Sequence, residues 1–351
     1  MRPIAAAMAG LAVVGALVGA ARGADPGPRP DLITAETEQA IQRGLAWLGR
    51  AQNRDGSWRS GQSEGGYPVA MTALAGLALM AGGSTPGQGE YADHVRRAVD
   101  FLLKSSNRNG LIAAMGEESR PMHGHGFAML FLAEAYGAEE DAELQRDIYR
   151  VLSRAIMLTA RSQSHDGGWL YKPDQNGDEG SVTVTQIQGL RACRNAGIKV
   201  PKSTISRACE YIGRCANADG GISYSVRNAG SSRPAITAAA VATLNNAGQY
   251  EHPVALRALE YLRKNCLGPG AGSGHAFAGH KFYMLLYLSQ AMYLSGEEDW
   301  RTFFPKHRDE FLRTQNKDGS WTGDFVGETY GTAIALLVLQ LPYRYVPILQ
   351  R

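Results

Sequence analysis

Histidines offer the clearest chemistry in this sequence, because several of them stand beside predicted helix starts. His123 and His125 form a His-Gly-His motif in front of one apolar segment, and His275 and His280 flank another. An imidazole titrates near neutral pH, so it can act as a general acid, a general base or a metal ligand. The same side chains could instead hydrogen-bond the backbone and line a polar rim.

The acidic loop 174–179 is the second group with suitable chemistry, since its oxygen-bearing side chains alternate as in a calcium loop. An EF-hand loop requires Gly after its third ligand and a late Glu. Glu179 and Thr185 occupy those two positions, so we predict a solvated loop and no calcium site. Glu179 directly precedes a predicted helix, whose N-terminus favours an anion, and could face a cavity there.

Other common chemistries find no support in the sequence. Nucleophile-elbow, P-loop, zinc-protease and dinucleotide motifs are missing, so no cofactor is predicted. The net charge is +3 without a basic run, which excludes a nucleic-acid partner. No pair of cysteines has the Cys-x-x-Cys spacing of a zinc site, and buried free thiols are favoured over disulfides whose pairing the sequence leaves open. The cysteines are Cys193, Cys209, Cys215 and Cys266.

An internal repeat supplies the elements that would position these side chains. A basic residue begins a short phrase with an aromatic or aliphatic residue four or five positions later, and most phrases end in Asp-Gly or Asn-Gly. Successive phrases begin 49 to 57 residues apart, which is typical of an array of two-helix units. The six starting residues are Arg43, Arg97, Arg154, Arg207, Arg257 and Lys306.

Each phrase predicts an amphipathic helix, and an almost wholly apolar helix follows each one. The apolar helices are expected at 68–80, 124–136, 182–196, 234–247, 280–295 and 329–341. A helix that is apolar on all sides must be buried on all sides. We therefore predict an all-α fold over residues 37–351, a single (α/α)6 toroid of six hairpins with an inner and an outer helix ring. Repeats two and five then lie on opposite sides, so their histidines are predicted to hold no metal.

Three of the phrases also share a Gln-to-Trp spacing, and the repeat resembles the prenyltransferase and squalene-oxidase repeat. The phrase looks like the QW motif of squalene and hopene cyclases, in which Gln and Trp tie neighbouring repeats together. The resemblance implies a terpenoid-cyclase-like toroid of the secreted bacterial single-toroid type and a structural role for these side chains. The pairs are Gln52 with Trp58, Gln163 with Trp169, and Gln315 with Trp321.

The resembling enzymes place their chemistry around the N-terminal ends of the inner helices. Cyclases carry an Asp-x-Asp-Asp acid before a Thr-Ala helix start, and none of the Thr-Ala starts at Thr72, Thr237 and Thr332 is preceded by it. The nearest acid is Glu179. Protein prenyltransferases use Asp, Cys and His as zinc ligands, and only His280 has a counterpart here. The resemblance therefore implies the fold without either known active site.

The N-terminus has the composition of an export signal. Residues 1–23 combine Arg2, an apolar stretch and small residues before a cut at Ala24, and residues 24–36 are predicted to be a flexible segment. We expect the protein to be exported, to the periplasm or the extracellular space, without a transmembrane domain after cleavage. An uncleaved anchor is the alternative. The sequence does not determine the oligomeric state.

Three functional hypotheses follow. In the first, the ring cavity holds an apolar, isoprenoid-like small molecule, bordered by His123, Tyr67, Tyr171, Tyr283 and Tyr330. In the second, Glu179, His125 and His280 form a catalytic site for a transfer, cyclase-like or hydrolytic reaction at the ring mouth. In the third, the protein is a non-catalytic interaction module of the cell envelope with an exposed apolar outer patch. Four acids that precede turn glycines are predicted to be structural: Asp55, Asp166, Asp219 and Asp318.

Overall fold

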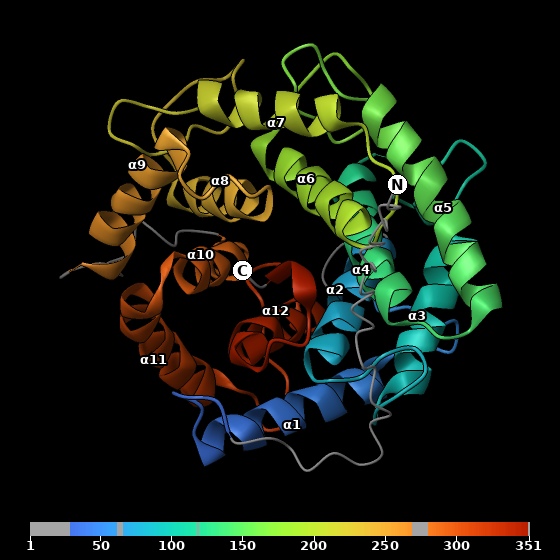
Figure 1. Ribbon diagram of the computed structural model, residues 1–351. Helices are drawn as coiled ribbons and strands as arrows, with labels where there is room; N and C mark the ends of the chain where they lie inside the picture. Colours follow the sequence, from blue (N-terminus) through green and yellow to red (C-terminus); the bar gives the residue numbers. More distant parts are fainter. Residues whose placement is uncertain (1–28, 62–65, 118, 269–279, 350–351) are drawn as a thin grey trace, which may run out of the picture.

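The computed structural model describes residues 29–61, 66–117, 119–268 and 280–349. Those residues form twelve α-helices arranged as two concentric rings, with only isolated β-bridges between loops (Figure 1). The outer helices are α1 (Ala35–Ala51), α3 (Ala92–Lys104), α5 (Ala142–Arg161), α7 (Lys202–Arg214), α9 (Pro253–Leu262) and α11 (Glu297–Thr314). The inner helices are α2 (Pro68–Ala81), α4 (Met122–Ala138), α6 (Gly180–Asn195), α8 (Pro234–Asn246), α10 (Lys281–Ser295) and α12 (Glu328–Gln340). The predicted all-α toroid is confirmed.

The ring closes through its first and last hairpins. Each inner helix packs against the next one along the chain, and α12 packs against α2. The first outer helix, α1, contacts both α11 and α12. Because the last hairpin meets the first, no apolar inner helix is left at an open end, and no polar capping repeat is needed.

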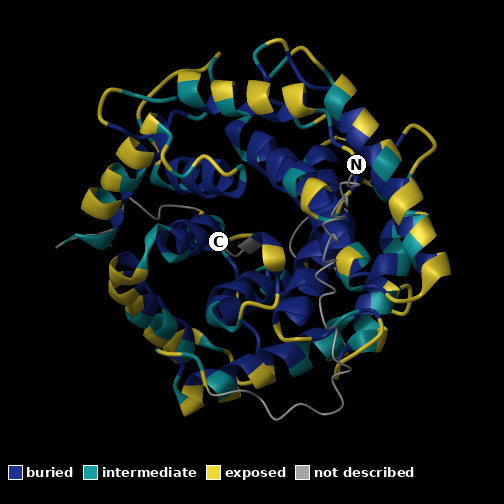
Figure 2. Ribbon diagram, viewed as in Figure 1, coloured by how far each residue is buried: buried dark blue, intermediate teal, exposed yellow. Residues whose placement is uncertain are grey.

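The two rings differ in burial as their sequences predict. Every residue of α2 is buried, since this helix carries no charge and is apolar on every side. Outer helices bury one stripe only, as α5 does with Ile148, Leu152 and Ala155. Figure 2 shows this as a buried inner ring within an outer ring whose helices expose their outward faces. The core therefore lies between the rings and within the inner one.

The turn that ends an outer helix locks each repeat to the next. Its glycine has positive φ and packs against the backbone carbonyl of the basic residue that begins the following phrase. A side chain at these positions would clash, because its Cβ would lie within 3 Å of that carbonyl oxygen. The contacts join Gly56 to Arg97, Gly110 to Arg154, Gly167 to Arg207, Gly220 to Arg257, and Gly319 back to Arg43.

The Gln and Trp side chains of the repeated phrase fasten the same turns. Gln163 Nε2 donates to the carbonyl of Gly167 in its own turn and to that of Thr204 in the next outer helix, at 2.8 and 2.9 Å. Trp169 Nε1 donates back to the carbonyl of Thr159, and its backbone N–H donates to the Thr183 hydroxyl of the inner helix. The pairs Gln52 with Trp58 and Gln315 with Trp321 make equivalent bonds.

Side chains and the end of the chain fill the ring below its mouth. The buried side chain of Gln188 on α6 donates to the buried side chain of Gln290 on α10 at 2.9 Å. These two helices are the neighbours of α8 in the inner ring, so the bond joins them directly across its interior. The short helix η3 (Pro347–Leu349) packs against α6, and the Ile348 N–H donates to Glu134 of α4. Two further short helices, η1 (Arg263–Leu267) and η2 (Leu341–Tyr343), follow α9 and α12.

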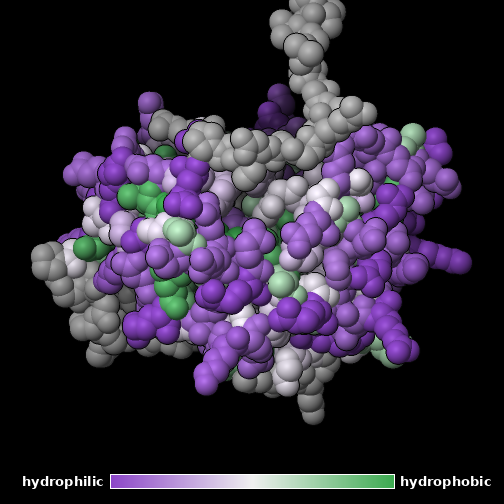
Figure 3. Space-filling view, turned by 90° about the horizontal axis from the view of Figure 1, so that it is seen from below, coloured by the Kyte–Doolittle hydropathy of each residue, from purple (hydrophilic) through white to green (hydrophobic). Residues whose placement is uncertain are grey.

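The outer surface is mainly polar. Figure 3 shows one side of the ring, which is mostly hydrophilic with small, separate hydrophobic patches. None of the helices in the described ranges combines the length and apolarity required to cross a membrane. The predicted signal at residues 1–23, residues 24–28 of the segment 24–36 and His275 lie outside the described residues. Residues 35 and 36 of that segment belong to α1.

Candidate functional site

A cavity of about 380 Å³ opens at the N-terminal ends of the inner helices, and all six contribute to its lining. Aliphatic and aromatic side chains form most of its wall, because the first turns of these helices carry almost no charged residues. The apolar lining includes Ala70, Met71, Leu74, Phe127, Ile236 and Leu286. A pocket of this size and composition is suited to a small organic molecule.

The structure brings most of the predicted cavity residues to this site. The five predicted border residues all line the cavity, and so does His280. His280 lies edge-on to Phe325, with ring centroids 5.5 Å apart. The border residues are Tyr67, His123, Tyr171, Tyr283 and Tyr330.

His125 does not line the cavity. Its side chain is fully buried between rings, where the Ile112 N–H donates to Nδ1 at 3.1 Å and Nε2 lies 3.0 Å from the Thr159 hydroxyl. Burial lowers the pKa of His125 to about 4, so the imidazole is neutral at pH 7. In the other repeats with this bond, an inner-helix threonine such as Thr183 accepts the equivalent N–H. His125 therefore occupies the structural position of that threonine.

Glu179 lies beside the cavity and is not part of its lining. It is the residue directly before α6, as predicted, and burial raises the pKa of its carboxyl group while the Tyr224 hydroxyl lowers it. Tyr224 itself lines the cavity. The structure thus brings His280 to the cavity and Glu179 next to it, and places His125 elsewhere.

A chain of hydrogen-bonded side chains crosses one wall of the cavity. His123 Nε2 lies 3.2 Å from the Ser181 hydroxyl, which lies 3.1 Å from the Tyr224 hydroxyl. The Tyr224 and Tyr171 hydroxyls are 2.9 Å apart. Burial, together with the positive charge of Arg120, lowers the pKa of His123 to about 4, so this imidazole is neutral at pH 7. Sequence reasoning missed Ser181 and Tyr224.

Two arginines stand over this chain, and sequence reasoning missed both. The guanidinium carbon of Arg120 lies 4.9 Å from the Tyr171 ring centroid, and that of Arg233 lies 4.8 Å from the Tyr224 ring centroid. Such stacking is a favourable cation–π geometry. The sequence does contain a feature that marks these arginines, because an Arg-Pro pair stands at the start of each of two inner helices, α4 and α8.

The carboxylates nearest the cavity are bound to backbone amides. Glu117 is buried and accepts from the Val69 N–H at 3.1 Å and the Ala114 N–H at 2.8 Å. Asp324 accepts from the first two amides of α10, at 3.1 and 3.0 Å. Burial raises the pKa of Asp324, and its bonds with the two amides oppose that rise.

Metal and thiol chemistry find no assembled site in the described ranges. No group of three His, Cys, Asp or Glu side chains there is placed to hold a metal ion. In the acidic loop, Asp174 accepts from Asn176 and Asp178 accepts from the Tyr211 hydroxyl and the Val226 N–H. All four cysteines are free thiols, and three are buried. Burial raises the pKa of Cys215 and Cys266 to about 12, which makes them poor nucleophiles.

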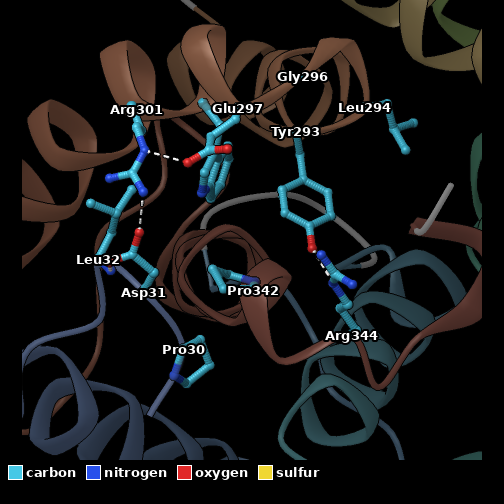
Figure 4. Close-up of a pocket in the computed structure, with 11 residues that line it drawn as sticks. Pro30, Asp31, Leu32, Tyr293, Leu294, Gly296, Glu297, Arg301, Pro342 and Arg344 are labelled. Atoms are coloured by element: carbon cyan, nitrogen blue, oxygen red, sulfur yellow. Dashed lines mark hydrogen bonds and ion pairs between the residues drawn. The ribbon is translucent and has the colours of Figure 1, made fainter. Parts of the chain in front are cut away.

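A second, more open pocket of about 540 Å³ lies at the other end of α10, between the start of α11 and residues 30–32 and 342–344 (Figure 4). The arginine side chains in its wall are bound to other side chains of the same pocket. Arg301 pairs with Glu297 and Asp31, and Arg344 donates to the Tyr293 hydroxyl at 2.7 Å. These contacts attach the N-terminal residues to the ring.

These features define the class of the protein. It is a closed α/α toroid of six helical hairpins, with a cavity lined by apolar and polar side chains at the N-terminal ends of its inner helices. Residues 138–306 match the family model described as the squalene-hopene cyclase C-terminal domain. The predicted resemblance to the squalene cyclase repeat is therefore confirmed over these residues. No curated protein matches the chain.

Solved structures show the same architecture at low sequence identity. The type II terpene cyclase MstE from Scytonema has a TM-score of 0.58 and 16% identity, covering 89% of this chain and 100% of that one. An alpha-1,6-mannanase from Salegentibacter has a TM-score of 0.62 and 10% identity, covering 88% and 99%. A protein from Actinoplanes has a TM-score of 0.57 and 18% identity, covering 88% and 99%. At such identities the likeness establishes the fold alone.

Proposed function

We propose that this protein binds an apolar, isoprenoid-like small molecule in the cavity at the mouth of its inner ring. The observation that carries the proposal is the cavity itself, about 380 Å³ in volume, to which all six inner helices contribute and whose lining is mostly apolar. Small-molecule sites typically measure about 300–1,000 Å³ and combine an apolar wall with few polar groups. A variant of MstE, which shares the fold, was solved with its substrate geranylgeranyl dihydroxybenzoate.

Apolar contact supplies the affinity in this proposal. Burying about 200 Å² of apolar ligand surface contributes about 5 kcal/mol, part of which offsets the freedom lost on binding. The wall is held by helices that are buried on every side, as α2 is, so little ordering is required when a ligand enters.

The polar contacts around the cavity favour binding over acid catalysis. Glu117 and Asp324 accept hydrogen bonds from backbone amides, and His125 is engaged between the rings. Acid–base partners must reach one substrate directly or through a water. Of the three groups in the catalytic hypothesis, only His280 lines the cavity.

The described surface gives the interaction-module hypothesis less support. The exposed large hydrophobics Tyr149 and Met157 belong to one outer helix and Leu256 to another, so they do not form one extended patch. Binding in the cavity thus remains the function that the described residues favour.

We also propose that the protein is exported, on the basis of the signal-like residues 1–23. Cell fractionation followed by sequencing of the mature N-terminus tests this proposal. A first residue at Ala24 in an extracytoplasmic fraction supports export, and an intact Met1 in the cytoplasm contradicts it.

Native mass spectrometry tests the binding proposal. Protein purified without detergent should show an added mass, and solvent extraction should release a hydrophobic molecule of that mass. Titration of stripped protein with farnesol should restore a one-to-one complex. If the stripped and folded protein binds no isoprenoid alcohol, acid or phosphate, the proposal is wrong.

A further inference from the structure

We propose that the ligand is amphipathic and that Arg120 and Arg233 bind an anionic head group, a carboxylate or a phosphate monoester, at the cavity mouth. This inference rests on the proposed function and adds the chemical class of the ligand. The two arginines line the same cavity, and they reach it from the starts of two different inner helices, α4 and α8.

Both arginines are packed on the same pair of hydrogen-bonded tyrosines. Arg120 stacks on Tyr171, Arg233 stacks on Tyr224, and the hydroxyls of these tyrosines are 2.9 Å apart. Neither guanidinium forms an ion pair or a hydrogen bond with another described residue. Two like charges beside one pair of phenols repel each other, so a bound anion would relieve the repulsion.

Two carboxylates lie near the arginines, Glu117 and Glu179. Glu117 lines the same cavity, where its two oxygens accept hydrogen bonds from the amides of Val69 and Ala114. The positive charges of Arg120 and Arg233 both lower the pKa of the Glu179 carboxyl group. Burial has the larger effect and raises this pKa, so the anionic form of Glu179 is disfavoured. The second pocket differs in this respect, because Arg301 there already pairs with Glu297 and Asp31. The mouth of the main cavity is therefore the place where positive charge is left available to a ligand.

The surrounding polar groups complete the recognition of an anion. The hydroxyls of Ser181, Tyr224 and Tyr171 form one hydrogen-bonded chain with His123 along this wall, so one hydroxyl hydrogen at the end of the chain can point to an anion when His123 Nε2 is the donor. Guanidinium groups bind carboxylate and phosphate oxygens in a planar, two-point manner. The apolar wall then receives the hydrocarbon part, so head group and tail are bound at different depths.

A purely structural account assigns both arginines to packing on tyrosine rings. That account predicts a loss of stability in arginine variants and no dependence of binding on the ligand head group. Probes with one tail and three head groups separate the accounts: farnesol, farnesoic acid and farnesyl monophosphate. Calorimetric titrations at low salt measure their dissociation constants.

We expect at least one of the two anionic probes to bind at least tenfold more tightly than farnesol. R120Q/R233Q should weaken the anionic probes at least tenfold more than farnesol and so remove this preference, and R194Q is the matched control. Arg194 is an exposed arginine at the other end of α6, and its variant should behave as the parent protein. Tight binding of only one anionic probe identifies a carboxylate or a phosphate as the head group.

Two outcomes overturn the inference. If all three probes bind equally, or if the double variant weakens all of them equally, the arginines do not recognise a head group, and the proposed function stands. If none binds to folded parent protein, the proposed function fails as well. A thermal melt of each variant confirms that it is folded before titration.

Discussion

Gly319, in the turn of the last repeat, packs directly against the carbonyl oxygen of Arg43 in the first outer helix. A Cβ at Gly319 would lie 2.5 Å from that oxygen. Two hydrogen bonds support the contact: Gln315 Nε2 donates to the Ala40 carbonyl, and Trp47 Nε1 donates to Asp318. The first and last repeats thus meet through the same turn-to-carbonyl contact that joins neighbours within the array.

Replacing Gly319 by Ala should destabilise the protein strongly, because the substitution adds a clash at the ring closure to the strain of φ near +98°. Gly197→Ala is the matched control, since Gly197 has φ near +82° with open space around it. The control should cost about 1 kcal/mol in the free energy of unfolding, and Gly319→Ala clearly more. Urea unfolding measures both, and equal costs would contradict the packing role of this turn.

His125 and His280 should respond differently to replacement by Ala. His125→Ala removes the partners of the buried Ile112 N–H and the Thr159 hydroxyl, so we expect a loss of about 1–3 kcal/mol in stability and unchanged ligand affinity. His280→Ala should reduce affinity with little effect on stability, because His280 is exposed at the cavity mouth. Melting curves and titrations of the two variants test this. An affinity loss specific to His125→Ala would restore the catalytic-site hypothesis for this residue.

The sequence predicted the fold well because the repeat carries two independent signals, helical periodicity and turn chemistry. It placed the inner helix at 124–136, and the structure has Met122–Ala138. Cavity residues such as Tyr67 and Tyr330 were also predictable, since they stand at inner-helix starts. Arg120 and Arg233 were marked only by the Arg-Pro pairs at two inner-helix starts, and the sequence does not show that both border one cavity, because that depends on how loops of non-neighbouring hairpins meet. The environment of His125 was equally hidden, since the sequence does not show which way a side chain points.

Asp166 should prove structural, as predicted for the turn acids. It pairs with Arg227 at 3.0 Å and with Arg214 at 3.6 Å, and it lies outside the cavity. Asp166→Ala should therefore lower stability by about 1 kcal/mol, comparable to the loss of a helix cap, and leave ligand binding intact. A variant that melts like the parent protein and no longer binds ligand would show that this acid belongs to the site.

Stability should depend on pH through Glu134, which is buried on the inner helix α4 and accepts from the Ile348 N–H. Burial raises its pKa from 4.5 to about 7 in the folded protein. The folded state therefore holds the proton more tightly than the unfolded state. This contribution is fully present below pH 4.5 and is lost as the pH rises toward 7 and above.

The variant Glu134→Gln isolates that effect, because glutamine keeps the shape without ionising. Its free energy of unfolding should fall less than that of the parent protein between pH 5 and pH 8, and the difference should amount to a few kcal/mol at most. Urea titrations at four pH values measure the two profiles. Parallel profiles would show that Glu134 does not ionise in this range.

The central claim is that the cavity at the inner-helix starts binds the ligand. Its most direct test is to fill the cavity with a larger side chain and to measure ligand binding by titration. Ala235 lines it from the first turn of α8, so Ala235→Phe should occupy the space that the ligand requires. Ala142→Phe, at the exposed start of α5, is the control for adding an aromatic side chain. In calorimetric titrations with farnesol and its acid, we predict binding to the parent protein and to Ala142→Phe, and at least a tenfold loss for Ala235→Phe. Equal binding by all three folded proteins would contradict the assignment of this cavity as the binding site.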